Sequence, residues 1–284
     1  MAATILYGKD IAQDIRAELA NDVEELKKQG VEPGLTVILV GDDPASHSYV
    51  RGKERGCQEV GIRSEVIYKD ASISEAELLD LIHQLNENPN VHGILVQLPL
   101  PPHISEKAVI EAIAPKKDVD GFHPLNVGNM MIGYDTLLPC TPHGIVELIK
   151  RTGTPIAGKH AVVIGRSNIV GKPVSFLLQQ ENATVTMCHS RTVDLAAYTR
   201  QADILVVAAG KPHLIGREHV KPGAVVIDVG VNRIETGKLV GDVKFEEVRE
   251  VAGYLTPVPG GVGPMTITML LKNTVAAARK QTAR

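Results

Sequence analysis

The sequence VVIGRSNIVGKP at residues 162–173 decides the fold. Its β-branched start predicts a strand, and its Gly and Ser residues predict a tight turn. The apolar spacing after the turn predicts a helix. N–H groups at such a helix start lack helical partners and lie at the positive end of the dipole, so a pyrophosphate fits there. The pattern differs from G-x-G-x-x-G, because Ser167 replaces the second glycine and the third lies at Gly171. We predict a Rossmann-type dinucleotide-binding turn with the contact residues Gly165, Arg166, Ser167, Val170 and Gly171.

The end of the next predicted strand, residues 183–188, indicates which cofactor binds. NAD enzymes usually carry Asp or Glu near this point to accept hydrogen bonds from the ribose 2′-hydroxyl. This chain has Ser190 and Arg191 instead, and Arg191 or Arg166 can form a forked pair with a 2′-phosphate. The sequence therefore favours NADP over NAD. In the alternative interpretation, Ser190 or Thr192 caps a helix and Arg191 is solvated.

Composition limits the class of protein. A length of 284 residues favours about two domains. A net charge of −3, few aromatic residues and no Trp argue against nucleic-acid binding. The three cysteines are widely spaced, which predicts a reduced, cytoplasmic protein, and Cys140 and His143 lack the second pair that a zinc site needs. No signal peptide or membrane-spanning run is evident, so we expect no membrane association. From the cysteine spacing and the net charge we also expect no metal and no nucleic acid.

Helical and strand periods alternate along most of the chain, which predicts two doubly wound α/β domains with parallel sheets. Residues 115–142 carry Gly and Pro without a sustained period and are interpreted as the irregular join between the domains. We predict a first domain of residues 1–138 plus 264–284 and a cofactor domain of residues 139–263. Helices are predicted at residues 11–26, 46–60, 75–85, 143–151 and 264–279, and strands at 35–40, 65–68, 93–96, 162–164, 183–188, 204–208 and 224–229.

Four polar residues in the first domain are candidates for chemistry. Tyr49 and Lys53 lie four residues apart and share a helix face, and a partly desolvated Lys can act as a base. Gln97 ends a buried strand, where ligands bind in doubly wound sheets. Asp120 precedes Gly121 and can accept two N–H donors from a heterocycle. The alternatives are a surface lysine beside a packed tyrosine, a Gln that satisfies loop carbonyls, and a turn dipeptide.

Loops of the cofactor domain supply further candidates. Gly210 follows the strand 204–208, and Val231 follows the strand 224–229, where the backbone commonly lies along the nicotinamide ribose. The run Pro259-Gly260-Gly261 could let the backbone approach a ligand closely. Its alternative role is a hinge into the last helix.

These motifs occur in one order on one chain, namely Tyr49-x-x-x-Lys53, QLPLP at 97–101, KDVDG at 117–121, GRS at 165–167 and PGGVGPMT at 259–266. Together they closely resemble the bifunctional methylenetetrahydrofolate dehydrogenase/methenyltetrahydrofolate cyclohydrolase family, bacterial type. The resemblance covers essentially the whole chain. It implies a homodimer of two α/β domains with a folate cleft between them, and the last helix returning to the N-terminal domain. It also implies a role in one-carbon metabolism and purine biosynthesis.

The resemblance implies NADP-dependent oxidation of 5,10-methylenetetrahydrofolate, followed by hydrolysis of the methenyl product to 10-formyltetrahydrofolate. Hydride transfer needs positioning and a nicotinamide but no general acid or base. Hydrolysis needs water and proton transfer, which the resemblance assigns to Lys53, supported by Gln97 and oriented with Tyr49. Asp120 would bind the pterin N–H groups. The implied substrate-binding residues are Tyr49, Gln97, Leu98, Asp120, Pro259, Gly260 and Gly261.

Two other functions are consistent with the same fold. One is a different two-domain NADP dehydrogenase, such as a shikimate- or amino-acid-dehydrogenase-like enzyme in which Lys53 relays protons. The other is a nucleotide-sensing or scaffold protein without catalysis. Neither accounts for the motifs at 97–101 and 259–266, and fold alone excludes neither.

Overall fold

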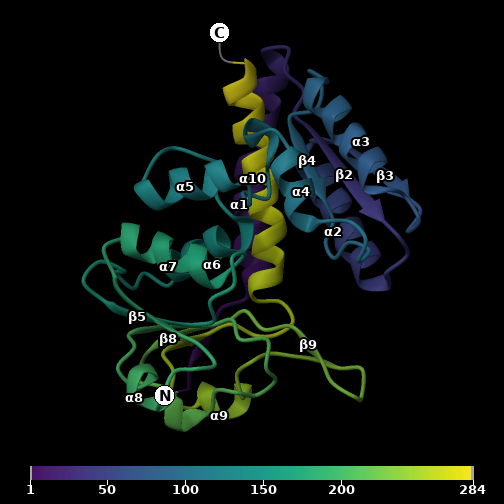
Figure 1. Cartoon of the computed structure of the whole chain (residues 1–284). Coiled ribbons are helices and arrows are strands. Elements are labelled where there is room, and N and C mark those ends of the chain that lie inside the picture. Colours follow the sequence, from purple (N-terminus) through teal and green to yellow (C-terminus); the bar gives the residue numbers. More distant parts are fainter. Residues whose placement is uncertain (1, 283–284) are drawn as a thin grey trace. The chain divides into compact units, whose positions relative to one another are not determined.

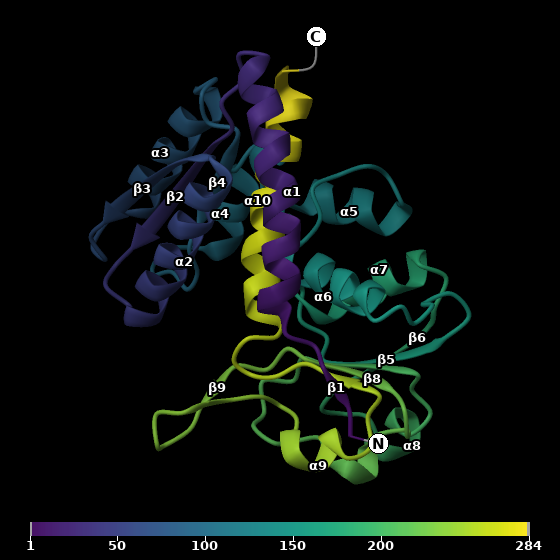
Figure 2. The same ribbon diagram turned by 180° about the vertical axis from the view of Figure 1, so that it is seen from behind.

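The computed structural model describes residues 2–282, which belong to two compact units (Figures 1 and 2). Unit 1 comprises Met1–Gln13 and Thr141–Thr266, and unit 2 comprises Asp14–Cys140 and Ile267–Arg284. Two long helices, α1 (Gly8–Lys28) and α10 (Val262–Thr282), contribute residues to both units. Within the described residues, no helix is both long and apolar enough to cross a membrane.

Unit 1 is built on a six-stranded parallel sheet with the order β1-β11-β8-β7-β5-β6. Figure 2 shows α6 (Cys140–Arg151) and α7 (Gly171–Gln180) over one face and α8 (Leu195–Thr199) and α9 (Phe245–Arg249) over the other. The strand order reverses beside β5, which makes this the switch point where doubly wound sheets bind dinucleotides. The strands are β1 (Thr4–Ile5), β5 (His160–Ile164), β6 (Thr184–Cys188), β7 (Ile204–Val207), β8 (Val225–Asp228) and β11 (Tyr254–Leu255).

The N-terminal strand lies at the edge of this sheet. Thr4 pairs with Tyr254 and Ile5 with Leu255, so the backbone groups of β1 are satisfied by β11. The sequence prediction included these residues in the folate domain, whereas the structure pairs β1 with the sheet of unit 1. A strand of two residues is too short for a period, so only its tertiary partner identifies it.

Unit 2 contains a three-stranded parallel sheet with the order β3-β2-β4. Its strands are β2 (Gly34–Val40), β3 (Arg63–Lys69) and β4 (Gly93–Val96), and β2 is buried along its whole length. The helices α2 (Pro44–Val60) and α3 (Glu75–Glu87) begin at side-chain caps. Asp43 accepts from the N–H of Ser46, and Ser74 and Glu77 form a capping box.

The segment predicted as an irregular join contains a helix, α5 (Pro124–Ile132). The prediction is wrong here because it interpreted the Pro and Gly residues as breakers. Pro124 occupies the first helical position, which suits its fixed φ, and His123 caps the helix by accepting from the N–H of Leu125. Gly133 ends the helix with φ +79°.

Other short elements were not predicted. They are α4 (Glu106–Ala112), η1 (Pro115–Lys117), η2 (Arg217–His219), β9 (Asn232–Arg233) and β10 (Leu239–Val240), together with α8, α9, β1 and β11. Each is shorter than the window over which a helical or strand period can be recognised.

The core of unit 2 gives a direct test of this packing. Ile38 lies in β2 and is completely buried among Ile, Leu and Val side chains of the sheet and its helices. We expect Ile38→Ala to lower the free energy of unfolding by about 2–5 kcal/mol, measured by urea denaturation, because it leaves a cavity. Ile132→Ala is the control, since Ile132 is 64% exposed and its loss should change stability by less than about 0.5 kcal/mol. Equal effects would contradict this core.

Candidate active site

A buried lysine and a glutamine at the end of a strand form the centre of the site in unit 2. Lys53 lies in α2 and is 9% exposed, and Gln97 follows the last residue of β4. The Lys53 Nζ donates to Gln97 Oε1 at 2.8 Å. Gln97 Nε2 donates to the Leu98 carbonyl at 2.7 Å, which turns the amide oxygen toward the lysine. Lys53 is therefore not the solvated surface lysine of the alternative interpretation.

Asp120 lies close enough to Lys53 for each to influence the other's pKa. Burial lowers the pKa of Lys53 below its ordinary value, and the Asp120 carboxylate partly offsets this. Burial raises the pKa of Asp120 to about 6, and the nearby Lys53 acts in the opposite direction. Both shifts bring the two groups nearer to neutral pH, where a side chain can accept and release protons.

In the motif KDVDG at 117–121, Lys117 and Asp118 hold the loop in place and Asp120 lies at the candidate site. Lys117 is buried, and its Nζ donates to the carbonyls of Leu85 and Asn88 at the end of α3, at 3.0 and 2.7 Å. Asp118 is also buried and accepts from Asn126 Nδ2 and from the N–H groups of Gly121 and His123, at 2.8–3.1 Å. These bonds fix the loop on which Asp120 is carried.

Two residues of the site were missed by the sequence reasoning. Cys140 is fully buried, and its pKa is raised by burial and by the neighbouring Asp120 carboxylate. Asn273, in α10, donates from Nδ2 to the carbonyls of Val119 and Leu138, both at 2.8 Å. It thereby joins both sides of the loop that presents Asp120. No motif marks a single Asn within a helix, so the sequence carried no signal for it.

The structure places the other predicted substrate residues as follows. Tyr49 lies one helical turn before Lys53 and is 49% exposed, and Leu98 directly follows Gln97. Pro259, Gly260 and Gly261 belong to unit 1, in the turn before α10. Their substrate-binding role stays a prediction.

The predicted phosphate turn lies between β5 and α7 in unit 1. Gly165 has φ +124°, and a Cβ there would lie 2.2 Å from the Ala208 carbonyl oxygen, so this position excludes a side chain. The Ser167 hydroxyl accepts from the N–H groups of Val170 and Gly171, at 3.1 and 3.3 Å. This arrangement forms a narrow turn at a helix N-terminus, which suits a pyrophosphate.

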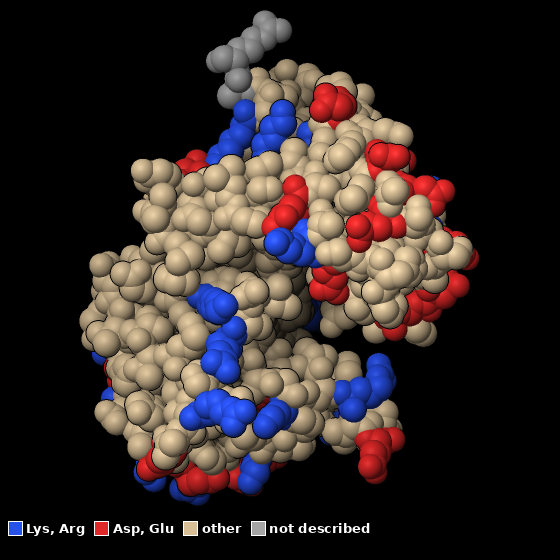
Figure 3. Space-filling view, in the orientation of Figure 1, with Lys and Arg blue, Asp and Glu red and all other residues tan. Residues whose placement is uncertain are grey.

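Arg166, Ser190 and Arg191 are exposed near the ends of β5 and β6. Side chains close the turn that follows β6. The Thr192 hydroxyl accepts a hydrogen bond from the His189 N–H, and the His189 ring accepts one from the Arg191 N–H. The cap of α8 is Asp194, so neither Ser190 nor Thr192 caps this helix, contrary to the alternative interpretation. Figure 3 shows Lys and Arg side chains grouped on one face of unit 1.

Gly210 and Val231 lie beyond the ends of β7 and β8, and Val231 is 53% exposed. The Gly210 N–H donates to the buried Asp242 carboxylate at 2.8 Å. Among residues 2–282, no group of three or more His, Cys, Asp or Glu side chains could hold a metal ion.

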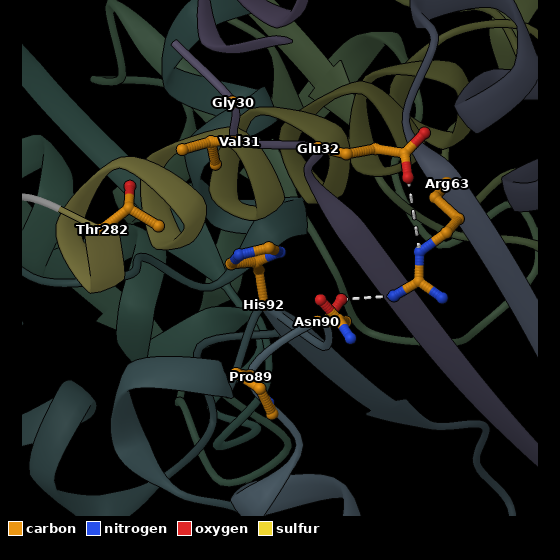
Figure 4. Close-up of a pocket in the computed structure, with 8 residues that line it drawn as sticks. All are labelled: Gly30, Val31, Glu32, Arg63, Pro89, Asn90, His92 and Thr282. Atoms are coloured by element: carbon orange, nitrogen blue, oxygen red, sulfur yellow. Dashed lines mark hydrogen bonds and ion pairs between the residues drawn. The ribbon is translucent and has the colours of Figure 1, made fainter.

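Figure 4 shows a pocket at the opposite end of the unit 2 sheet. Its volume is about 470 Å³, and His92, Arg63 and Glu32 contribute to its lining, near the amino ends of the strands. It contains none of the predicted site residues. Ligands of doubly wound sheets bind at the carboxyl ends, so this pocket does not define the site.

The backbone beside Asp120 has no room for a side chain. A Cβ on Gly121 would lie 2.5 Å from the Leu138 carbonyl carbon, and its φ is +76°. We expect Gly121→Ala to lower the free energy of unfolding by more than about 1 kcal/mol, measured by urea denaturation. Gly128→Ala is the control, because a Cβ there meets nothing within 4 Å and should leave stability equal or higher. A stable Gly121→Ala protein would contradict the close approach.

Comparison with known proteins identifies two domains of one family in this chain. The catalytic domain of the tetrahydrofolate dehydrogenase/cyclohydrolase family matches residues 6–120. The NAD(P)-binding domain of the same family matches residues 139–282. Both predicted functional regions therefore have counterparts in one family.

Individual relatives extend over the whole chain. The Bifunctional protein FolD of Brevibacillus brevis is 81% identical over 281 residues, covering 99% of each chain. The crystal structure of the bifunctional methylenetetrahydrofolate dehydrogenase/cyclohydrolase FolD from Campylobacter jejuni has a TM-score of 0.96 and 52% identity, covering 98% of this chain and 99% of that one. The Trypanosoma brucei enzyme, solved with NADP cofactor and inhibitor, has a TM-score of 0.95 and 41% identity over the full length of both. The chain belongs to the tetrahydrofolate dehydrogenase/cyclohydrolase family.

Proposed function

We propose that the two activities of this family use different residues of the chain, with unit 1 binding NADP and unit 2 binding and hydrolysing the folate. The enzyme oxidises 5,10-methylenetetrahydrofolate to the 5,10-methenyl compound and hydrolyses this to 10-formyltetrahydrofolate. The observation that carries the assignment is the buried Lys53–Gln97 hydrogen bond beside Asp120. Such proton-transferring groups are needed for the hydrolysis alone.

Oxidation depends on positioning. In the substrate a carbon lies between two nitrogens, and a nitrogen lone pair helps to expel a hydride. NADP supplies the acceptor for this hydride. The product is a delocalised cation, so no side chain has to donate or remove a proton. The contribution of the protein to this step is to orient the two reactants.

Hydrolysis requires proton transfer. Water adds to the methenyl carbon of the cation, and the uncharged Lys53 amine accepts a proton from this water as the C–O bond forms. The added hydroxyl then loses its proton and becomes the formyl C=O as the bond between the carbon and N5 breaks. N5 takes up one proton, and the formyl group remains on N10. One proton is released overall, because a cation and water give a neutral product. A lysine whose pKa is lowered by burial is suited to this exchange.

Gln97 and Tyr49 would support Lys53, and Asp120 would hold the pterin. The Gln97 oxygen fixes the position of the Lys53 Nζ. The Asp120 carboxylate can accept both the amino and the ring N–H groups of the pterin. Such donors favour the ionised carboxyl and would therefore lower the pKa of Asp120 from about 6 when substrate binds. Leu98, Pro259, Gly260 and Gly261 complete the proposed substrate contacts.

The proposed NADP site consists of the phosphate turn, the end of β6 and two later loops. Gly165, Ser167, Val170 and Gly171 would hold the pyrophosphate. Ser190, with Arg191 or Arg166, would recognise the 2′-phosphate. Gly210 and Val231 would lie beside the nicotinamide half.

We also propose that the enzyme is a homodimer that acts in the cytoplasm. The resemblance to the bacterial family supports the dimer. Three buried cysteines without disulfides support a reducing compartment.

Lys53→Met tests the hydrolytic role. The substitution keeps an unbranched side chain but removes the amine, so hydrolysis of the methenyl compound should fall by at least about 100-fold while NADP reduction stays measurable. Both are followed by absorbance with purified protein. Lys107→Met is the control, since Lys107 is exposed on α4 and should leave both activities unchanged. Full retention of hydrolysis would remove Lys53 from the mechanism.

Arg191→Ala tests 2′-phosphate recognition. Loss of a charge-assisted bond of about 1.5–3 kcal/mol should raise the KM for NADP about 10-fold or more, with little change for NAD. The exposed Arg200, at the end of α8, provides the matched control Arg200→Ala. Equal loss for both cofactors would assign the recognition to Arg166 or Ser190.

A further inference from the structure

We propose that Asp242 and Asp228 are positioning residues that shape the loops beside the nicotinamide half of the cofactor. Neither residue was singled out by the sequence for binding or catalysis. The inference rests on the proposed binding of NADP by unit 1. It adds the residues that set the affinity for one half of that cofactor.

Asp242 joins the loops that follow β7 and β8. It is fully buried, and its Oδ2 accepts from the N–H groups of Ala209 and Gly210, at 2.7 and 2.8 Å. Its Oδ1 accepts from Asn232 Nδ2 at 2.8 Å. One carboxylate thus fixes the backbone of Gly210 and the side chain of Asn232, which is next to Val231.

Asp228 holds Asp242 in turn. It is the last residue of β8 and is 4% exposed. Its Oδ1 accepts from the N–H groups of Gly230 and Asp242, and its Oδ2 from that of Val243, each at 3.0 Å. A Cβ on Gly241 would lie 1.7 Å from Asp228 Oδ2, so the backbone packs directly on this carboxylate.

The sheet topology places this network beside one half of a dinucleotide. In a doubly wound sheet, each side of the switch point binds one mononucleotide. The phosphate turn and Arg191 lie on the side of β5 and β6, which takes the adenosine and its 2′-phosphate. β7 and β8 lie on the other side, which takes the nicotinamide ribose. The two aspartates therefore act on the nicotinamide half alone.

Carboxylates suit this role because they are acceptors only. Five backbone N–H groups and one side-chain amide converge on these two side chains. Charged acceptors make stronger bonds than neutral ones, and removing them leaves buried N–H groups unsatisfied. Burial raises the pKa of Asp228 to about 7, against the effect of its N–H donors, so binding is best measured well above this pH.

The experiment compares two probes by isothermal titration calorimetry. NADP spans both halves of the site, whereas adenosine 2′,5′-bisphosphate occupies only the adenosine half. We expect Asp242→Ala to weaken NADP at least fivefold and to change binding of the bisphosphate less than twofold. Hydrolysis of the methenyl compound, which needs no NADP, should remain, and unchanged binding of the bisphosphate shows that unit 1 is folded.

Two further variants keep the result interpretable. Asn232→Ala removes one partner of Asp242 from a half-buried position and should weaken NADP at least threefold, again without effect on the bisphosphate. Asp194→Ala is the matched control, because it removes a helix cap on the adenosine side of the unit. It should lower stability but leave the affinity for NADP within twofold.

Each outcome has a distinct meaning. The inference would be overturned if Asp242→Ala weakened NADP less than fivefold and Asn232→Ala less than threefold. It would also be overturned if NADP and the bisphosphate lost affinity in parallel. Failure of the parent protein to bind either probe would instead overturn the proposed NADP site. An insoluble Asp242→Ala protein leaves Asn232→Ala to decide between these outcomes.

Discussion

Buried aspartates that accept backbone N–H groups hold the loops on which both sites depend. Asp118 does so in unit 2, and Asp228 and Asp242 do so in unit 1. Irregular loops cannot satisfy their own N–H groups as helices and sheets do, and each unsatisfied buried group costs about 1–3 kcal/mol. A carboxylate offers several acceptor positions at one point. Loops can therefore converge at the carboxyl ends of the strands, where ligands bind.

The need to provide partners for buried polar groups also explains the lowered pKa of Lys53. A buried ammonium is costly without partners, and here Gln97 provides a direct one while Asp120 provides charge nearby. The balance leaves the lysine with a lowered pKa and the aspartate with a raised one. The groups proposed to carry out the hydrolysis thus lie together in unit 2. The turn after β5 in unit 1 provides a geometry for phosphate without a comparable lysine–carboxyl pair.

Long, regular elements could be predicted from the sequence because their periods are local. β2, α2 and the β5–α7 turn all appear where their patterns place them. The sequence motifs also contain Lys53, Gln97 and Asp120, which the fold brings close together. The prediction failed at α5, where Pro124 begins the helix and Gly133 follows its last residue, and at β1, whose two residues have no period.

The sequence by itself determined the α/β class, the tight Gly/Ser turn between β5 and α7 and the family, because these depend on residue types at fixed short spacings. Only the tertiary structure decided that Lys53 is buried against Gln97 and that Asn273 reaches the loop of Asp120. It also decided that Asp118 and Asp242 accept from backbone N–H groups, whereas Asp120 lies near Lys53. The reason is physical. A carboxylate has the same chemistry at every position, and its role depends on which donors the folded chain brings within about 3 Å of it.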